Sequence, residues 1–356
     1  MRHRVLGATG MQVSTVCLGA MMFGSMGNRD HDDSIRVIHT ALDAGVNFID
    51  TADVYSAGES EQIVGKALRG SRRDGVVLAT KFSMPMGEDP NSRGGSARWV
   101  RRAVEDSLRR LDTDHIDLYQ IHRPDYDTDV EETLSALSDL VREGKVRAIG
   151  SSTYPAELIV EAQWAAQRGG HRRFTTEQPL YSVLTRSVER AVLPTAHRHG
   201  MGVLTYSPLN GGWLSGRADP AGGQRAAGRP TMYDTSIAEN RAKAEAVAAL
   251  REIAAEAGLT LPHLALGFVL AHPAVTSVII GPRTHEQLVG LLDGGDVELP
   301  VDVLDRIDEV VPPGVDVNPA DNYKATPPDL TDLALRRRIY GLPLPGRAAT
   351  AAVAAA

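Results

Sequence analysis

Residues Val76–Lys81 read VVLATK, and residues Ile116–Gln120 read IDLYQ. Both runs are short and largely apolar, which is typical of strands buried on both faces of a parallel sheet. The segment between them has apolar residues at helical spacing, namely Val100, Val104, Leu108 and Leu111. The stretch from residue 76 to residue 120 therefore predicts a strand–helix–strand unit with parallel strands.

The same alternation of apolar runs and amphipathic stretches extends through most of the chain. Eight strands are expected, at Val16–Ala20, Asn47–Asp50, Val76–Lys81, Ile116–Gln120, Arg147–Gly150, Phe174–Gln178, Val203–Tyr206 and Ser277–Ile280. Helical spacing recurs between them, for example at Ile35, Ile38 and Leu42, at Val188 and Val192, and at Ala246, Leu250 and Ile253. This repeat favours an α/β fold, the closed (β/α)8 TIM barrel. An open doubly wound sheet is the alternative.

The length of 356 residues and the hydrophobic content of 42% suit one barrel of roughly 250–330 residues. We assign residues 1–312 to the barrel and residues 313–356 to a C-terminal extension, whose last ten or so residues we expect to be disordered. Residues 4–14 predict a β-hairpin before the first barrel strand. Residues 210–236 are rich in Gly, Ala and Pro, and so long a loop indicates a lid.

Composition argues against several classes of partner. The net charge is −7, so no basic surplus favours nucleic acid. Cys17 is the only cysteine, which is typical of a cytoplasmic protein. No run approaches the roughly 20 apolar residues of a membrane span, and the first residues do not resemble a signal peptide. His197 and His199 have no carboxylate or cysteine cluster beside them, so we expect no metal site. The sequence specifies no oligomeric state.

Four polar side chains are expected near the C-terminal ends of successive strands, where barrel enzymes build their active sites. Asp50 ends the second strand and Tyr55 follows it, Lys81 ends the third strand, and His122 follows the fourth. An ammonium group close to a phenol lowers the pKa of the phenol, and Asp50 can keep Lys81 charged. A neutral His122 can orient a substrate carbonyl while Tyr55 protonates its oxygen. Together these groups indicate carbonyl reduction.

Three segments carry a resemblance to a known family. They are Gly45–Ala52 (GVNFIDTA), Asp117–His122 (DLYQIH) and Gly144–Ser152 (GKVRAIGSS). With Tyr55 and Glu59 after the first segment, the sequence resembles the aldo-keto reductase superfamily from about Leu6 to Asp308. The resemblance implies NADPH-dependent reduction of a small aldehyde or ketone. It also implies a catalytic tetrad of Asp50, Tyr55, Lys81 and His122, with Tyr55 as the general acid.

The resemblance also implies a cofactor site. Ser152 and Gln178 are similar to the family residues that bind the nicotinamide carboxamide. Tyr206 lies where an aromatic ring stacks on the nicotinamide and leaves one face open to substrate. Ser207 and Leu209 would lie near the pyrophosphate.

A phosphate site is expected after the eighth strand. Gly281 lets a phosphate approach the backbone, and the following helix N-terminus favours anions. Arg283 can clamp a 2′-phosphate, so we expect NADPH rather than NADH. Gln287, in the first turn of that helix, is assigned to the same site.

Some positions depart from the family pattern. Thr153 stands where the family often has Asn beside the carboxamide-binding serine, and Gly290 and Leu291 replace an acidic residue and an Asn that contact adenine. The glycine-rich segment Gly211–Gly216 does not open a helix after the first strand, so it is not a dinucleotide fingerprint of the open-sheet type.

Two other functions remain open at this level. Some members of the superfamily act as regulatory subunits, such as potassium-channel β subunits, and use bound cofactor as a sensor. Alternatively, Lys81 could form a Schiff base in a barrel lyase or isomerase, which requires a lysine without a carboxylate partner. The expected proximity of Asp50 argues against the Schiff base.

Overall fold

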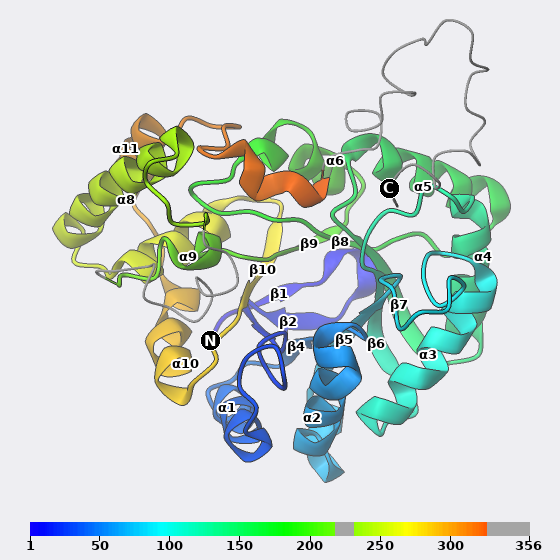
Figure 1. Ribbon diagram of the computed structural model, residues 1–356. Coiled ribbons are helices and arrows are strands. Elements are labelled where there is room, and N and C mark those ends of the chain that lie inside the picture. Colours follow the sequence, from blue (N-terminus) through cyan, green and yellow to red (C-terminus); the bar gives the residue numbers. More distant parts are fainter. Residues whose placement is uncertain (218–230, 326–356) are drawn as a thin grey trace, which may run out of the picture.

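The computed structural model describes residues 1–217 and 231–325 (Figure 1). Eight parallel strands form a closed barrel, and β10 pairs with β3 to complete it. They are β3 (Val16–Gly19), β4 (Phe48–Asp50), β5 (Val77–Phe82), β6 (Ile116–Ile121), β7 (Val146–Ser152), β8 (Thr176–Gln178), β9 (Gly202–Thr205) and β10 (Val275–Ile280). The predicted TIM barrel is therefore confirmed, and the open doubly wound sheet is wrong.

Helices surround the barrel, and α10 packs against α1 to close the ring (Figure 1). The ring consists of α1 (His31–Asp43), α2 (Glu59–Ala67), α3 (Ala97–Leu111), α4 (Val130–Arg142), α5 (Ala156–Gly169), α6 (Val192–Arg198), α9 (Leu261–Ala271) and α10 (His285–Leu292). Two further helices, α8 (Ala238–Glu256) and α11 (Val301–Val310), pack against each other.

The helix α3 shows how local sequence sets these elements. The Ser96 side chain caps it by accepting a hydrogen bond from the Trp99 amide, which otherwise has no partner within the helix. The predicted apolar stripe, with Val104 and Leu108, is buried against the barrel. The helix ends at Leu111, and the next residue, Asp112, has a left-handed backbone. Capping and burial together therefore define both ends and the inward face.

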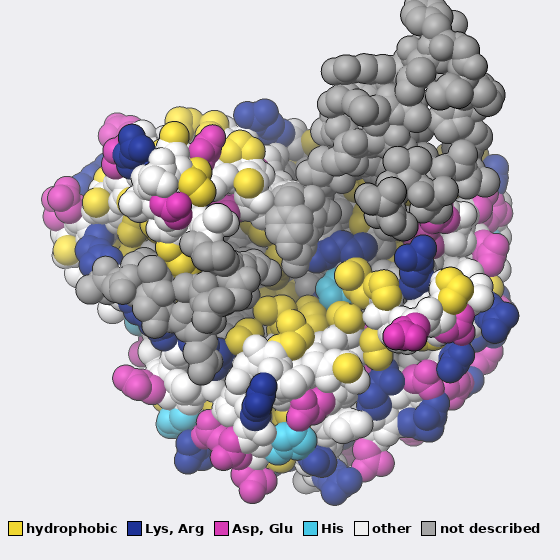
Figure 2. All heavy atoms as spheres, in the orientation of Figure 1, with side chains coloured by type: hydrophobic (Ala, Val, Ile, Leu, Met, Phe, Trp, Pro, Cys, Tyr) yellow, Lys and Arg dark blue, Asp and Glu magenta, His cyan; other side chains and the backbone are white. Residues whose placement is uncertain are grey.

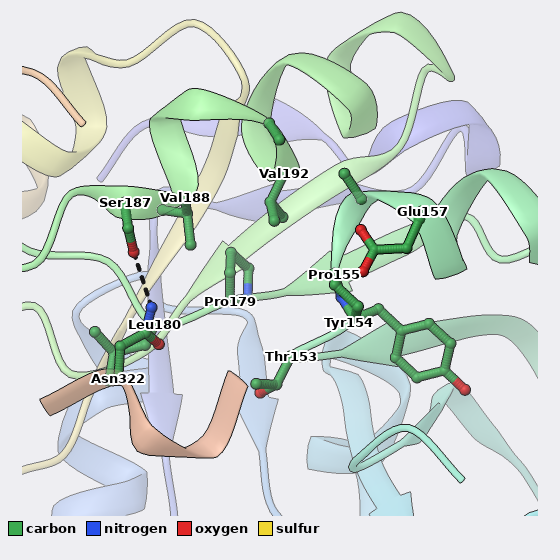
Figure 3. Close-up of a pocket in the computed structure, with 12 residues that line it drawn as sticks. Thr153, Tyr154, Pro155, Glu157, Pro179, Leu180, Ser187, Val188, Val192 and Asn322 are labelled. Carbon is green, nitrogen blue, oxygen red and sulfur yellow. Dashed lines mark hydrogen bonds between the residues drawn. The ribbon is translucent and has the colours of Figure 1, made fainter. Parts of the chain in front are cut away.

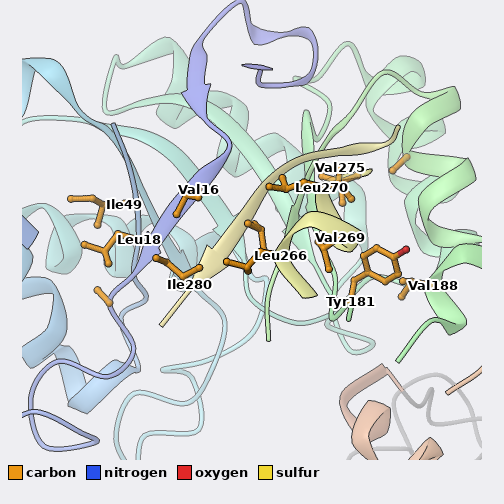
Figure 4. Packing of buried hydrophobic residues seen from close by; sticks show 14 of the residues in the cluster. Val16, Leu18, Ile49, Tyr181, Val188, Leu266, Val269, Leu270, Val275 and Ile280 are labelled. Atoms are coloured by element: carbon orange, nitrogen blue, oxygen red, sulfur yellow. The ribbon is translucent and has the colours of Figure 1, made fainter. Parts of the chain in front are cut away.

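The predicted N-terminal hairpin is present as β1 (His3–Val5) and β2 (Gln12–Ser14), which pair in antiparallel fashion. Leu6 and Val13 pack with Cys17 and with residues from β4, β5, β6, β7, β9 and β10 in a core inside the barrel. A second core lies between the strands and the helices, and Figure 4 shows part of it around Val16, Leu18 and Ile280. The hairpin thus closes the N-terminal end of the barrel, and the C-terminal end remains for a site.

After α11 the chain runs back over the loop that follows β8. Val317 donates its amide proton to the Leu184 carbonyl at 3.0 Å, and Asp316 accepts from the Ser187 amide at 2.7 Å. The last described element is the 3₁₀ segment Pro319–Ala325, in which Asp321 pairs with the buried Lys243 at 2.7 Å. We call residues 312–322 the C-terminal strap. Residues 218–230 of the predicted lid and residues 326–356 of the extension lie outside the described residues.

Within residues 1–217 and 231–325, no single helix has the length and apolar character needed to cross a membrane. The bent pair α8–α9 meets those two criteria only when its helices are taken together.

Candidate active site

Asp50 and Lys81 form a buried ion pair at the C-terminal ends of β4 and β5. The Lys81 Nζ donates to Asp50 Oδ1 at 2.5 Å and to the Thr51 carbonyl at 2.9 Å, and the Lys81 side chain is fully buried. Burial lowers the pKa of Lys81, but the negative charge of Asp50 and the contact with Tyr55 outweigh this, so the pKa lies above its ordinary value. Lys81 is therefore charged, which is unfavourable for a Schiff base.

Tyr55 begins the short 3₁₀ segment that follows β4 (Tyr55–Gly58). Its hydroxyl lies 3.4 Å from Lys81 Nζ, which donates to it. Burial raises the pKa of Tyr55, and the Lys81 ammonium opposes this rise only in part. Lys81 thus lowers the pKa of the phenol as expected, but desolvation of the phenolate, which the sequence did not predict, is the larger effect, so the net pKa lies above its ordinary value. The phenol carries its proton in this state, as an acid must.

His122 follows β6 directly and completes the predicted set of four. Its backbone amide donates to the Phe82 carbonyl at 2.8 Å, which ties it to the end of β5, and its side chain is buried. The imidazole meets the Tyr55 ring edge-on, with centroids 5.6 Å apart. The structure thus brings Asp50, Tyr55, Lys81 and His122 together at one end of the barrel.

Two amide side chains bind the second oxygen of Asp50. Gln120 Nε2 donates to Asp50 Oδ2 at 3.2 Å, and Gln178 Nε2 donates to it at 2.9 Å. Sequence reasoning assigned Gln178 to a nicotinamide carboxamide and did not single out Gln120. Because the nitrogen of Gln178 is bonded to Asp50, its contribution to a cofactor amide would be its oxygen, which accepts a hydrogen bond.

The residues expected around the nicotinamide lie at the ends of β7 and β8 and directly after β9. Ser152 Oγ donates to the Gln178 carbonyl at 2.9 Å, and the hydroxyls of Thr153 and Tyr206 are 3.5 Å apart. The Tyr206 side chain is partly exposed, so one ring face can receive a planar group. Arg123, a residue that sequence reasoning missed, donates from Nη1 to Thr153 Oγ1 at 2.6 Å. Its position directly after His122 was the signal that could have identified it.

A buried carboxyl group, which was also not predicted from the sequence, supports the turn at Thr153. Glu177 on β8 accepts from Ser151 Oγ at 2.5 Å and from the Tyr154 amide at 3.0 Å. Burial raises the pKa of Glu177 to about 7. These contacts hold the turn at Thr153, whose backbone has a positive φ of 59°.

Left-handed backbone in residues other than glycine gathers in the loops at this end of the barrel. Among the described residues, such φ values occur at Asp112 and, in loops after barrel strands, at Ser56, Ala57, Ser83, Thr153, Ser207 and Asn210. This conformation costs energy for residues with a Cβ, and it persists where the surrounding structure enforces it, often at functional sites.

The predicted phosphate segment forms the start of α10. Thr284 caps the helix by accepting from the Gln287 amide at 3.3 Å, and Gln287 Oε1 accepts from the Arg283 amide at 2.9 Å. Asn28 donates to the Arg283 carbonyl at 3.0 Å, which ties this turn to the loop after β3. A Cβ atom added at Gly281 would meet nothing within 4 Å, so there is open space beside the backbone. These features fit a bound phosphate.

A cavity of about 190 Å³ lies beside the Thr153 turn, between the starts of α5 and α6 (Figure 3). Its walls combine apolar residues, such as Pro155, Pro179 and Val188, with polar ones. Asn322 of the C-terminal strap closes one side and donates to Ser187 Oγ at 2.8 Å. Figure 2 shows hydrophobic side chains around a central hollow on this face of the molecule. In residues 1–217 and 231–325, no group of three His, Cys, Asp or Glu side chains is arranged to hold a metal ion.

Comparison with known proteins agrees with this architecture. The family model described as "Aldo/keto reductase family" matches residues 15–312. The oxidoreductase YrpG of Bacillus subtilis (strain 168) is 40% identical over 324 residues, 88% of this chain and 96% of the relative. A probable voltage-gated potassium channel subunit beta of Arabidopsis thaliana is 35% identical, over 87% of this chain and 97% of its own length. Norsolorinic acid reductase of Aspergillus flavus is 30% identical, over 96% of this chain and 91% of its own length. The chain belongs to the aldo/keto reductase family.

Proposed function

We propose that the protein reduces an aldehyde or ketone to an alcohol with NADPH as cofactor and Tyr55 as the general acid. The observation that carries this proposal is the contact of Tyr55 with Lys81, whose charge is held by Asp50, beside the ring of His122. Family membership supports carbonyl reduction in general. A protonated phenol beside a fixed ammonium is suited to give a proton to an oxygen that is gaining negative charge.

Each of the four side chains has its own role in this reaction. Tyr55 donates its phenolic proton to the carbonyl oxygen, and Lys81 stabilises the phenolate that remains. Asp50 keeps Lys81 charged and fixed, while Gln120 and Gln178 hold Asp50 in place. His122 orients the substrate oxygen toward the phenol. The buried surroundings exclude water from these contacts and strengthen them.

NADPH, when bound, supplies the hydride that the carbonyl carbon accepts. The Tyr206 ring would support the nicotinamide, and Ser152 and Gln178 would bind its carboxamide. The remaining contacts, to the phosphates and the ribose, would come from Ser207, Leu209, Gly281, Arg283 and Gln287.

The test is NADPH oxidation with a panel of aldehydes and ketones, comparing wild type with Tyr55→Phe. The substitution removes the acidic proton and keeps the ring, so we expect turnover to fall at least about 100-fold. NADPH affinity, followed by fluorescence, should stay within about threefold. Turnover that survives in Tyr55→Phe would contradict the assigned acid. The same assay with NADH in place of NADPH compares the two cofactors.

Similarity to potassium channel β subunits supports a second candidate, a cofactor-binding regulatory subunit. Such a role requires a stable oligomer and slow cofactor exchange. Size-exclusion chromatography and the NADPH exchange rate test both conditions, and rapid exchange from a monomer would argue for the enzyme.

A further inference from the structure

Arg123 is held rigidly at the mouth of the barrel by neutral groups alone. Its Nη1 donates to the His122 carbonyl at 2.7 Å, to Thr153 Oγ1 at 2.6 Å and to Ser152 Oγ at 3.5 Å. None of these three acceptors carries a charge. The guanidinium is therefore fixed in place, and no carboxylate of the described residues is in direct contact with it.

Two other sheltered cations of the described chain have carboxylate partners, whereas Arg4, like Arg123, binds neutral acceptors, the Val275 and Leu270 carbonyls. Lys81 pairs with Asp50 at 2.5 Å, and Arg110 pairs with Glu61 at 2.6 Å. Within residues 1–217 and 231–325, no carboxylate lies within 4.0 Å of Arg123, and its Nε and Nη2 find no acceptor. The Nε–Nη2 edge has the geometry that receives both oxygens of a carboxylate.

This charge lies beside the reacting groups. The Arg123 guanidinium acts to lower the pKa of Tyr55 and of Glu177, although burial raises both by more. Arg123 is partly exposed, and Thr153, which it holds, lies 3.5 Å from the Tyr206 hydroxyl. An anion that reached Arg123 would therefore sit next to the position where the proposed function places the carbonyl.

We propose that Arg123 binds a carboxylate group of the substrate, so that the preferred substrates are oxo acids, meaning aldehydes or ketones that also carry a carboxylate. This inference rests on the proposed function and names its substrate class. The carboxylate pairs with the Nε–Nη2 edge while Nη1 stays on the protein. Two other roles for Arg123, contact with the cofactor carboxamide and stabilisation of the developing alkoxide, would affect charged and uncharged substrates alike.

The experiment compares two matched substrate pairs with NADPH: 4-formylbenzoate with its methyl ester, and 4-oxobutanoate with its methyl ester. Each pair shares one aldehyde and differs in charge. For wild type we expect kcat/KM to favour the acid over the ester in at least one pair by about 10- to 100-fold, the range of a charge-assisted hydrogen bond. In Arg123→Gln this preference should fall to about one, and Arg123→Lys should restore part of it.

The control is Arg102→Gln, which removes the same charge from the exposed face of α3 and should leave the preference unchanged. Equal turnover of acid and ester by wild type overturns the proposal. An equal loss of kcat/KM for acid and ester in Arg123→Gln also overturns it. The proposal is likewise overturned if wild type reduces other carbonyls but neither substrate pair. If wild type reduces no carbonyl at all, the proposed function itself is wrong.

Discussion

Lys81 is a buried ammonium whose charge is matched by a single carboxylate. Replacing it by methionine leaves Asp50 buried without its counter-ion, so we expect Lys81→Met to lower the free energy of unfolding by about 3–5 kcal/mol and to abolish most turnover. Urea unfolding and NADPH oxidation measure the two effects. The double variant Lys81→Met/Asp50→Asn should regain most of the stability and none of the activity. If Lys81→Met were as stable as wild type, the ion pair would contribute little to the free energy of unfolding.

Asp53 provides a prediction about pH. Burial raises the pKa of Asp53 from 3.8 to about 8, and the charge of Glu61 adds to this rise. A carboxyl whose pKa rises on folding binds its proton more tightly in the folded state. Its contribution to stability is therefore complete below about pH 4 and is lost as the pH rises toward 8, by at most about 1.4 kcal/mol per pH unit.

Asp53→Asn removes this titration, so its stability relative to wild type should increase from pH 5 to pH 8. Urea unfolding at several pH values measures the difference. Glu245→Gln removes an exposed carboxylate and serves as the control, for which we expect little pH dependence. Parallel curves for wild type and Asp53→Asn would show that Asp53 ionises normally.

The four polar residues of the site could be predicted from the sequence, but the hydrogen bonds that position them could not. Asp50, Tyr55, Lys81 and His122 stand at strand ends, which the apolar runs locate. The bond from Gln178 to Asp50 joins residues 128 positions apart, and no local pattern reports such a contact. The net rise in the pKa of Tyr55 could not be predicted for a related reason, because the burial of this side chain depends on the folded structure around the site.

Two helical glycines have opposite expected effects on stability. A Cβ atom on Gly65 in α2 would lie 2.5 Å from the Leu111 carbonyl of α3, so Gly65→Ala should destabilise the protein by about 1–3 kcal/mol. Gly290 in α10 has open space around its Cβ position, and Gly290→Ala should stabilise by about 0.5–1 kcal/mol. Thermal unfolding of both variants tests the pair, and two shifts of the same sign would contradict the packing argument.

All eight strands were predicted within a few residues, because buried parallel strands are continuous apolar runs. The helix suggested by Val188 and Val192 is instead interrupted. A 3₁₀ segment (Ser187–Arg190) precedes α6, and Ala191 between them has a φ of −143°. The 3₁₀ segment has a partner far away in the sequence, since Asp316 of the C-terminal strap accepts from the Ser187 amide at 2.7 Å.

The C-terminal strap is attached to the barrel domain through a buried charge. Lys243 is fully buried, lies over the Trp213 ring at 4.8 Å and pairs with Asp321 at 2.7 Å. We expect Asp321→Asn to lower stability by about 1–3 kcal/mol, because the ammonium loses its partner. Urea unfolding followed by tryptophan fluorescence measures this. Asp305→Asn, an exposed change on α11, is the control, and equal losses in the two variants would count against the pair.

Asn322 shows that the walls of the cavity come from two separate parts of the chain. The family match ends at residue 312, whereas Asn322 forms one wall of the cavity beside Thr153. Asp50, Tyr55, Lys81 and His122 therefore lie within the matched segment, and part of the adjoining wall comes from the C-terminal strap that follows it. A substitution in the strap is therefore expected to reshape this wall while Asp50, Tyr55, Lys81 and His122 stay in place, so the two can change independently of each other.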